Sequence, residues 1–332
     1  MANYRRKIMK ITFTKTELNS KTKIRAKLKE SLSAFKDISK YYNEDEIFSL
    51  ILSAIRVNEL NIIEIEKIRN RTQYIVDTEK VKYWIDKRLF PNTVQISTDD
   101  KELLKLLIFS LAMPYKMLKG ETKATMSEKV QRGKERDFEQ IFSDTFVGKI
   151  GEIIFKQYAK QKFEREIILD WGISREIETF KSDIVNSKKV VSIKSTDTLE
   201  SIWAEAPKNA DYGILVKVSL PKDFLMKILA YISSLEKLLN FVKEKIQKDI
   251  TASDTMDLVN FIKETAYDEQ MAIKAFTCGF FKTSELTFKH KGDNLPFIGG
   301  EFEIYEDKHL IKCNELKYTK QDWNEFFKDI FV

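Results

Sequence analysis

Apolar residues recur at spacings of three and four over much of the first 130 residues, which is the period of an amphipathic helix. The clearest stretches are "EDEIFSLILSAIRVNEL" at 44–60 and "TDDKELLKLLIFSLAM" at 98–113, which begins with a capping residue and acids and ends before Pro114. The stretch at 61–90, "NIIEIEKIRNRTQYIVDTEKVKYWIDKRLF", predicts two further helical pieces around Thr72–Thr78. We therefore expect residues 1–130 to be mainly helical.

The pattern changes after about residue 136. A helical stretch, "DFEQIFSDTFVGKIGEIIFKQYAKQKF", precedes three segments rich in β-forming residues: "REIILDWG", "REIETFKSDIV" and "KKVVSIKST". "TLESIWAEA" then predicts a short helix, and "YGILVKVSL" predicts a buried strand. Residues 222–273 are again helical, and the chain ends with strands in "TCGFFKTSELTF", "GEFEIYED" and "HLIKCNELK" and a last helix, "TKQDWNEFFKDIF".

This order predicts two regions in an α/β protein. Residues 1–130 form a helical, basic N-terminal region. Residues 131–332 form a domain with one central mixed sheet flanked by helices, and residues 222–273 are a helical insert in it.

Composition narrows the chemistry. The chain has 332 residues, but only two histidines, His290 and His309, and two cysteines, Cys278 and Cys313. This excludes most zinc sites and most histidine-based acid–base schemes, and leaves carboxylates, lysines, hydroxyls and a hard cation. The sequence has no apolar run long enough to span a membrane and no secretory signal at its start, so we expect a cytoplasmic protein without membrane contact.

Positive charge is concentrated near the N-terminus. The net charge is +6, and residues 1–40 contribute +9, from twelve Lys or Arg against three Asp or Glu, which leaves −3 for the rest. A second basic run covers 116–136. This asymmetry indicates contact with a polyanion, although a solvated lysine-rich surface would give the same pattern.

Arginine is the usual bidentate reader of guanine and phosphate. All eleven arginines lie at or before Arg175. If arginines bind DNA in this protein, the best candidates are Arg69, Arg71, Arg132 and Arg136.

A polar face is expected on a hairpin in "FKSDIVNSKKVVSIKS". If the turn is centred between Ser187 and Lys188, residue 183 pairs with residue 192, and paired residues share a face of an antiparallel ladder. Asp183, Ser192 and Lys194 would then project together, away from the apolar side. A carboxylate can bind Mg²⁺ and a nearby lysine can offset phosphoryl charge, but an ordinary salt bridge between Asp183 and Lys194 is the alternative.

The chain resembles the PD-(D/E)XK nuclease superfamily, and within it the type II restriction endonucleases, over roughly residues 136–220. The matching pieces are "GKIGE" with Glu152, "SD" with Asp183, "SIK" with Lys194, and "YGILVKV". The resemblance implies a restriction-endonuclease-like sheet in which a helix carries a glutamate, one strand carries the metal-binding aspartate, and the next strand carries (D/E)-x-K.

Two residues depart from the family pattern. Ser182 stands in place of the proline, and Ser192 stands in place of the acid of (D/E)-x-K, which would normally hold metal. A subset of these endonucleases has serine there and takes a glutamate from the following helix. By that likeness Glu205 is the candidate and Glu200 the second choice. Otherwise the site rests on Glu152 and Asp183, or is catalytically inactive.

The resemblance thus implies a Mg²⁺-dependent type II restriction endonuclease that hydrolyses phosphodiester bonds of double-stranded DNA at a specific short site. Asp183 would hold the metal, with Glu205 or Glu152 sharing it, and Lys194 would position the attacking water. Palindromic targets favour a homodimer. Two alternatives remain open: a repair or junction-resolving nuclease, and a DNA-binding protein without catalysis, which the serine at position 192 favours.

Overall fold

The computed structural model gives the architecture of most of the chain. The residues that it describes are 10–33, 40–68, 71–97, 101–119, 130–131, 134–135, 137–172, 181–220 and 272–331. The predicted helical insert at 222–273 lies outside these residues, except for its last two positions, which begin a strand.

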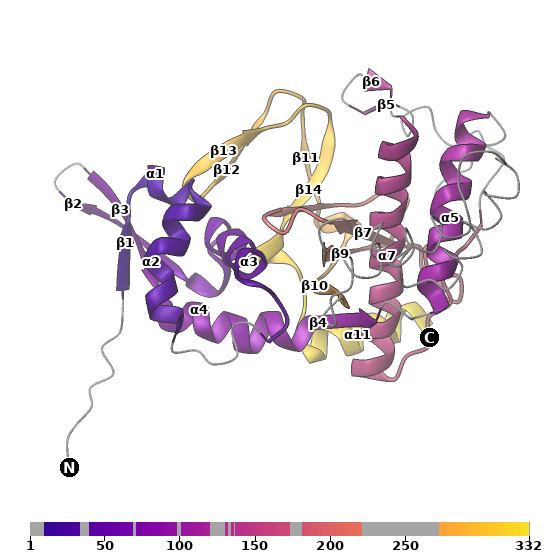
Figure 1. Cartoon of the computed structure of the whole chain (residues 1–332), viewed down its shortest axis with the longest axis horizontal. Helices are drawn as coiled ribbons and strands as arrows, with labels where there is room; N and C mark the ends of the chain where they lie inside the picture. The colour runs from indigo at the N-terminus through magenta and orange to yellow at the C-terminus, as the bar shows by residue number, and fades with distance from the viewer. Residues whose placement is uncertain are drawn as a thin grey trace, which may run out of the picture.

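A four-stranded mixed sheet lies at the centre of the molecule (Figure 1). Its order is β4 (Thr93–Ser97), β10 (Ala272–Lys282), β9 (Tyr212–Ser219) and β7 (Val191–Thr196). β10 runs antiparallel to both of its neighbours, whereas β7 runs parallel to β9. All eight residues of β9 are buried, as expected for a strand covered on both faces. The predicted α/β class with a central mixed sheet is confirmed.

One face of the sheet is covered by three helices. α7 (Phe138–Phe163) crosses this face, with α5 (Lys101–Leu118) beside it and α11 (Lys320–Phe331) near its end (Figure 1). Their apolar side chains pack with those of β7 and β9 in one core cluster, in which Phe155, Trp323 and Phe326 stack closely. This core fixes α7, and therefore the residues on it, against β7.

The N-terminal region covers the other face. α3 (Glu44–Arg56) contributes a continuous run of buried residues, and a second core cluster joins it to Leu215 of β9 and to Phe276 of β10. Arg88 connects the two regions: its Nε lies 2.5 Å from Glu59 Oε1, and its Nη2 donates to the Cys278 carbonyl at 2.6 Å. The N-terminal region is therefore packed on the sheet along its whole inner side.

The prediction of a mainly helical N-terminal region is partly wrong. It contains α1 (Lys15–Leu18), α2 (Lys21–Ser33), α3 and α4 (Thr78–Trp84), but also a three-stranded antiparallel sheet. The strands are β1 (Lys10–Phe13), β2 (Ile63–Ile68) and β3 (Arg71–Asp77), so the stretch predicted as helix around Thr72 forms a hairpin. Alternation of isoleucine with charged residues in "IEIEKI" satisfies the strand period, although Ile63 is buried and Ile65 is 55% exposed.

Short strands complete the molecule near the C-terminus. β14 (Lys308–Lys312) pairs with β11 (Thr287–Lys289) and with β8 (Trp203–Glu205), and β12 (Asn294–Phe297) forms a hairpin with β13 (Gly300–Glu303). The final strands and the terminal helix agree with the sequence prediction. The short helix predicted in "TLESIWAEA" is wrong, because its second half forms β8 and pairs with β14.

No helix among the described residues is both long enough and apolar enough to cross a membrane.

The contact between α7 and β7 depends on one glycine. A Cβ at Gly151 would overlap Ser195 of β7, whereas a Cβ at Gly148 would meet nothing within 4 Å. Gly151 therefore permits the close approach of α7 to β7, whereas this approach does not require a glycine at position 148.

We predict that Gly151→Ala lowers the free energy of unfolding by about 1–3 kcal/mol, because the added methyl group overpacks the helix–sheet contact. The matched variant Gly148→Ala should be neutral or stabilising by up to about 1 kcal/mol, because alanine is the better helix former. Urea denaturation of both variants measures the difference. Equal stabilities would contradict the packing described here.

Candidate active site

The segment around Asp183 extends the central sheet beyond β7. The Asp183 N–H donates to the Val191 carbonyl at 2.9 Å, and the Val185 N–H donates to the Ile168 carbonyl at 2.8 Å. Leu169 and Ile184 form an isolated antiparallel bridge. Asp183 therefore lies between β7 and the segment that ends with Asp170.

The predicted hairpin register is wrong. Beyond Val191 the backbone ladder stops, and side chains replace it: the Ile193 N–H donates to Asp183 Oδ2 at 2.6 Å, and the Val191 N–H donates to Ser182 Oγ at 3.0 Å. The cause is a compact turn, in which Ser187 Oγ donates to the Ile184 carbonyl at 2.7 Å and pulls the segment away from β7. The two segments diverge, and the Asp183 carboxylate fills the opening.

Asp183 still lies near Lys194. The positive charges of Lys149 and Lys194 and the bond from the Ile193 N–H all lower the pKa of Asp183, but burial outweighs them and raises it to about 6. The interaction with Lys194 is therefore one part of a larger electrostatic cluster.

Glu152 is the second acid of this cluster. It lies on the face of α7 that packs against the sheet, and its Oε2 accepts a hydrogen bond of 2.7 Å from Lys149 Nζ, with both side chains buried. Burial and the negative charge of Asp183 raise the pKa of Glu152 to about 8, against the opposing effect of Lys149. Asp183 and Glu152 therefore share one buried site.

Lys149 and Asp170 belong to the same site and were not singled out from the sequence. Lys149 Nζ also donates to the Asp170 carbonyl at 2.7 Å, and the negative charge of Asp170 raises the pKa of both Glu152 and Asp183. The rings of Phe109 and Trp171 lie about 5 Å from Lys149 Nζ and shield it from solvent. The sequence contains a feature that could have identified each of them: Lys149 precedes Glu152 by one helical turn, and Asp170 interrupts an apolar strand segment.

Lys194 and Ser192 project from the face of β7 opposite to α7. Lys194 is half-buried and makes no hydrogen bond or ion pair with another residue in the described part of the chain, which leaves its ammonium group available. Ser192 is fully buried opposite Gly213, and its Oγ has no hydrogen-bond partner among the described residues. Ser192 is therefore a buried residue of the β7–β9 ladder.

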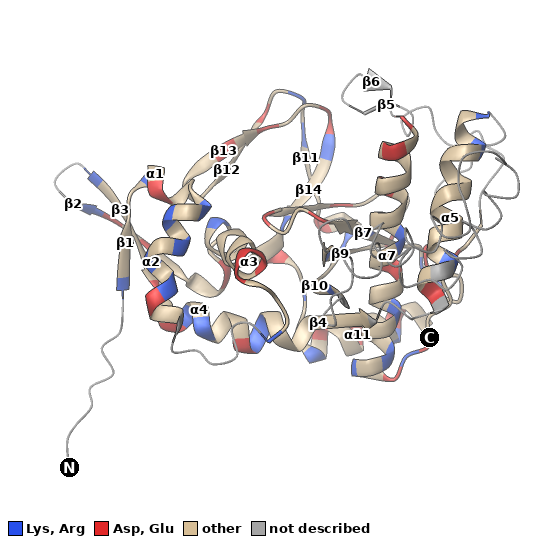
Figure 2. Cartoon of the chain, in the orientation of Figure 1, with Lys and Arg blue, Asp and Glu red and all other residues tan. Residues whose placement is uncertain are grey.

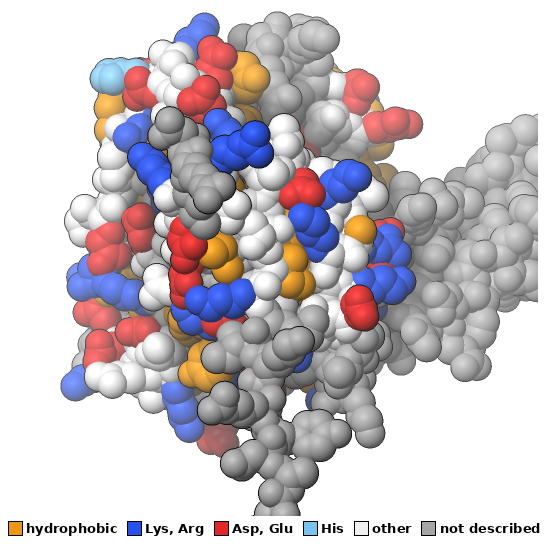
Figure 3. Space-filling model, turned by 90° about the vertical axis from the view of Figure 1, so that its left-hand side faces the viewer, with side chains coloured by type: hydrophobic (Ala, Val, Ile, Leu, Met, Phe, Trp, Pro, Cys, Tyr) orange, Lys and Arg blue, Asp and Glu red, His pale blue; other side chains and the backbone are white. Residues whose placement is uncertain are grey.

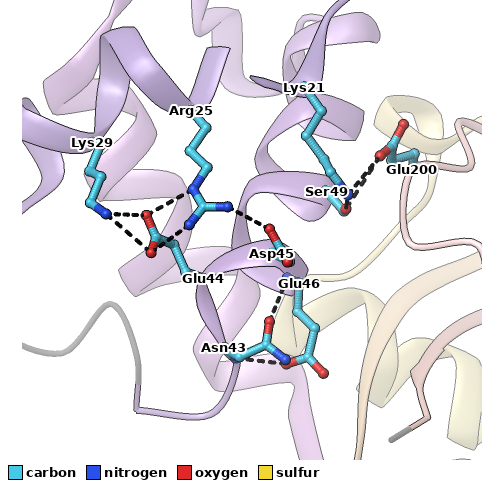
Figure 4. Close-up of polar contacts among 9 residues, drawn as sticks. All are labelled: Lys21, Arg25, Lys29, Asn43, Glu44, Asp45, Glu46, Ser49 and Glu200. Carbon is cyan, nitrogen blue, oxygen red and sulfur yellow. Dashed lines mark hydrogen bonds and ion pairs between the residues drawn. The ribbon is translucent and has the colours of Figure 1, made fainter. Parts of the chain in front are cut away.

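Glu205 and Glu200 are each paired with cations that are not part of this acid cluster. Glu205 Oε2 lies 3.0 Å from Lys308 Nζ across the β8–β14 ladder. Glu200 is held by the N-terminal region: Ser49 Oγ donates to it at 3.3 Å, and Lys21 and Arg56 lie 3.7 and 3.4 Å away (Figure 4). The negative charge of Asp170 raises the pKa of Asp183, and the charges of Asp183 and Asp170 raise the pKa of Glu152.

The basic N-terminal region is largely neutralised by its own acids. On α2, Arg25 pairs with Glu44 and Asp45, and Lys29 shares Glu44 (Figure 4). Figure 2 shows acidic and basic residues interspersed along this region, and Figure 3 shows acidic and basic side chains next to one another on this face. The net charge of the sequence therefore does not appear as a continuous basic patch on the described part of this face.

Of the four arginines predicted to contact DNA, one is described. Arg71 is exposed at the start of β3, at the opposite end of the molecule from α7 and β7 (Figure 1). Arg69, Arg132 and Arg136 lie outside the described residues.

The acid cluster fits a magnesium ion held by few protein ligands. Among the described residues no group of three or more His, Cys, Asp or Glu side chains is arranged to hold a metal ion. Mg²⁺, however, is commonly bound through one or two carboxylates, with water and substrate phosphates completing its shell. Asp183 and Glu152 suit that role, because burial raises the pKa of both and a divalent cation would stabilise their charged forms.

Comparison with known proteins adds no relative: no family model, no curated protein and no solved structure matches this chain.

We predict that Glu152→Gln changes the pH dependence of stability in EDTA. The folded protein holds a proton on Glu152 that the unfolded chain loses above pH 4.5, so the wild type loses stability as pH rises toward about 8. The neutral amide removes this loss. Relative to wild type, the variant should gain at least about 2 kcal/mol in the free energy of unfolding between pH 5 and pH 8.5.

Urea denaturation at the two pH values measures this gain. Glu166→Gln, at an exposed acid after α7, is the matched control and should shift both values equally. A parallel pH dependence in wild type and Glu152→Gln would show that Glu152 ionises normally.

Proposed function

We propose that this protein is a Mg²⁺-dependent endonuclease that hydrolyses double-stranded DNA, with the organisation of a type II restriction endonuclease. One observation carries the proposal: two carboxylates with raised pKa values, the half-buried Asp183 and the buried Glu152, lie in one site near Lys194, where two strand segments diverge. Lys194 has no hydrogen bond or ion pair with any residue that the structure describes. Burying such groups costs free energy, and a site that tolerates that cost is a candidate for catalysis.

The arrangement of elements supports the same proposal. A long helix with Glu152 precedes the segment at 167–169, the segment at 183–185, β7 with Lys194 and the parallel strand β9. This is the order that the resemblance implies, except that a loop and β8 stand where a helix was expected.

Each residue has a distinct role in the proposed reaction. Asp183 and Glu152 would hold Mg²⁺, which supplies a water of lowered pKa and polarises the phosphate. Lys194 orients the attacking water and offsets negative charge that develops on the phosphoryl oxygens. Lys149 keeps the Glu152 carboxylate in place through its 2.7 Å hydrogen bond.

Specific cutting at a short site and action as a homodimer belong to this proposal, since two-fold targets favour two-fold proteins. Cytoplasmic location belongs to it as well: both cysteines are buried and free, which suits a reducing compartment.

Digestion of plasmid DNA tests the proposal. Wild type should give discrete fragments in Mg²⁺ and leave the plasmid intact in EDTA. Asp183→Ala and Lys194→Ala should each slow cutting at least about a hundredfold, because each removes a group that acts on the transition state. DNA binding in EDTA should remain.

Lys208→Ala, at an exposed loop lysine, is the control for Lys194 and should cut normally. Smeared products would favour a repair or other non-specific nuclease, and binding without cutting would favour a non-catalytic DNA-binding protein. Full activity of either site variant would remove the assignment of Asp183 and Lys194.

A second experiment tests whether Glu152 or Glu205 holds the metal ion together with Asp183. Glu152→Gln should raise the Mg²⁺ concentration that gives half-maximal cutting by at least about tenfold, because it removes a metal-holding carboxylate. Glu205→Gln should leave that concentration unchanged, because Glu205 is paired with Lys308. The reverse result would return the metal to Glu205, as the sequence predicted.

A further inference from the structure

A pocket of about 750 Å³ opens beside Lys194. Its walls are β7, the segment that leads into β8, and the β12–β13 hairpin with the residues that follow it. Its volume is within the range of small-molecule sites, and Lys194 is the one residue of its lining that the proposed cleavage chemistry uses.

Aromatic rings line this pocket. Phe302 and Tyr305 are 44% and 57% exposed and meet edge to face, with ring centroids 5.8 Å apart. Trp203 lines it as well, and its ring packs against the buried Leu295 and Leu310. Exposed aromatic rings at the edge of a pocket suit stacking against another flat ring.

Two hydrogen-bond donors of the lining lack acceptors. Trp203 Nε1 and Arg56 Nε are buried, and neither has a hydrogen-bond partner within the described ranges. A buried donor without an acceptor costs free energy, so a ligand that brings acceptors would be favoured.

The charge of the lining excludes a phosphate as its occupant. Glu200, Glu205, Glu301 and Glu306 face three cations, Arg56, Lys194 and Lys308, which leaves a net charge of −1. An excess of carboxylates repels phosphate but accepts hydrogen bonds from amino groups. The matching ligand is a flat, uncharged ring that has both acceptor atoms and an amino group.

Lys194 joins this pocket to the acid cluster, because it lines the pocket and its charge also acts on Asp183. A nucleotide whose phosphate lies at Lys194 and Asp183 would therefore have its base next to the pocket. We propose that the pocket receives a single nucleobase with an exocyclic amino group, swung out of the DNA beside the cleaved phosphate. This proposal rests on the proposed function, because it takes DNA as the source of the base.

Binding of short fluorescein-labelled duplexes in EDTA, followed by fluorescence anisotropy, tests the proposal. The duplexes are fully paired or carry one unpaired adenine or one unpaired thymine. An unpaired base avoids the cost of leaving the helix, and stacking favours its insertion, so the adenine bulge should bind about tenfold tighter than the paired duplex. The thymine bulge should gain less, because thymine lacks an exocyclic amino group.

Variants of the pocket residues test whether the pocket causes the preference for the adenine bulge. Phe302→Ala and Tyr305→Ala should abolish the preference for the adenine bulge, and Trp203→Phe should reduce it, because the ring is kept and the N–H is lost. Phe288→Ala, at an exposed ring on β11 outside the pocket, should keep the full preference. Far-ultraviolet circular dichroism confirms that each variant is folded.

The outcomes separate this proposal from the nuclease itself. Equal affinity for the three duplexes, or a preference that survives Phe302→Ala and Tyr305→Ala, overturns the pocket assignment even if the protein cuts plasmid DNA. A preference lost in both variants supports the assignment even if no Mg²⁺-dependent cutting is found. Tight binding of free adenosine without any preference among the duplexes would assign the pocket to a free nucleoside and overturn DNA as the source.

Discussion

The account depends on the burial of two mutually repelling carboxylates, Asp183 and Glu152. Burial raises the pKa of both acids, and the negative charge of Asp183 raises that of Glu152 further. Lys149 stabilises the pair only in part, although its ammonium group bonds both Glu152 and the Asp170 carbonyl. A fold with no use for these acids could replace them with apolar residues and lose nothing.

The rest of the architecture holds this pair in position. β9, buried on both faces, fixes β7 from one side, and the contact of Gly151 with Ser195 brings α7 close to it. The N-terminal region closes the opposite face through α3 and the buried Arg88. The site therefore lies at the edge of the sheet, between α7 and the segment around Asp183, where side-chain hydrogen bonds replace the backbone ladder. Lys194, on the opposite face, connects it with the pocket.

The sequence predicted the sheet better than it predicted the site. The strand in "YGILVKV" was confirmed because burial on both faces leaves a continuous apolar run, and the terminal helix because its buried residues recur every three or four positions. "IEIEKI" was misjudged because a short alternating run fits two periods, and β8 because its partner β14 lies more than a hundred residues later. The nearness of Asp183 to Lys194 followed from local spacing. The part played by Lys149 and Asp170 could not be predicted from local spacing, because it depends on how α7 packs on the sheet. The predicted hairpin register was wrong because hydrogen bonds of the Ser182 and Ser187 side chains replace the backbone ladder.

Isothermal titration of the full chain with Mg²⁺ at pH 7, in two buffers of different ionisation enthalpy, tests the central claim most directly. The shared site predicts that one ion binds per chain and releases about one proton, because Glu152 is mostly protonated before the ion arrives. It also predicts that the double variant Asp183→Asn, Glu152→Gln binds no ion. Binding without proton release, or binding that survives in the double variant, would contradict the account.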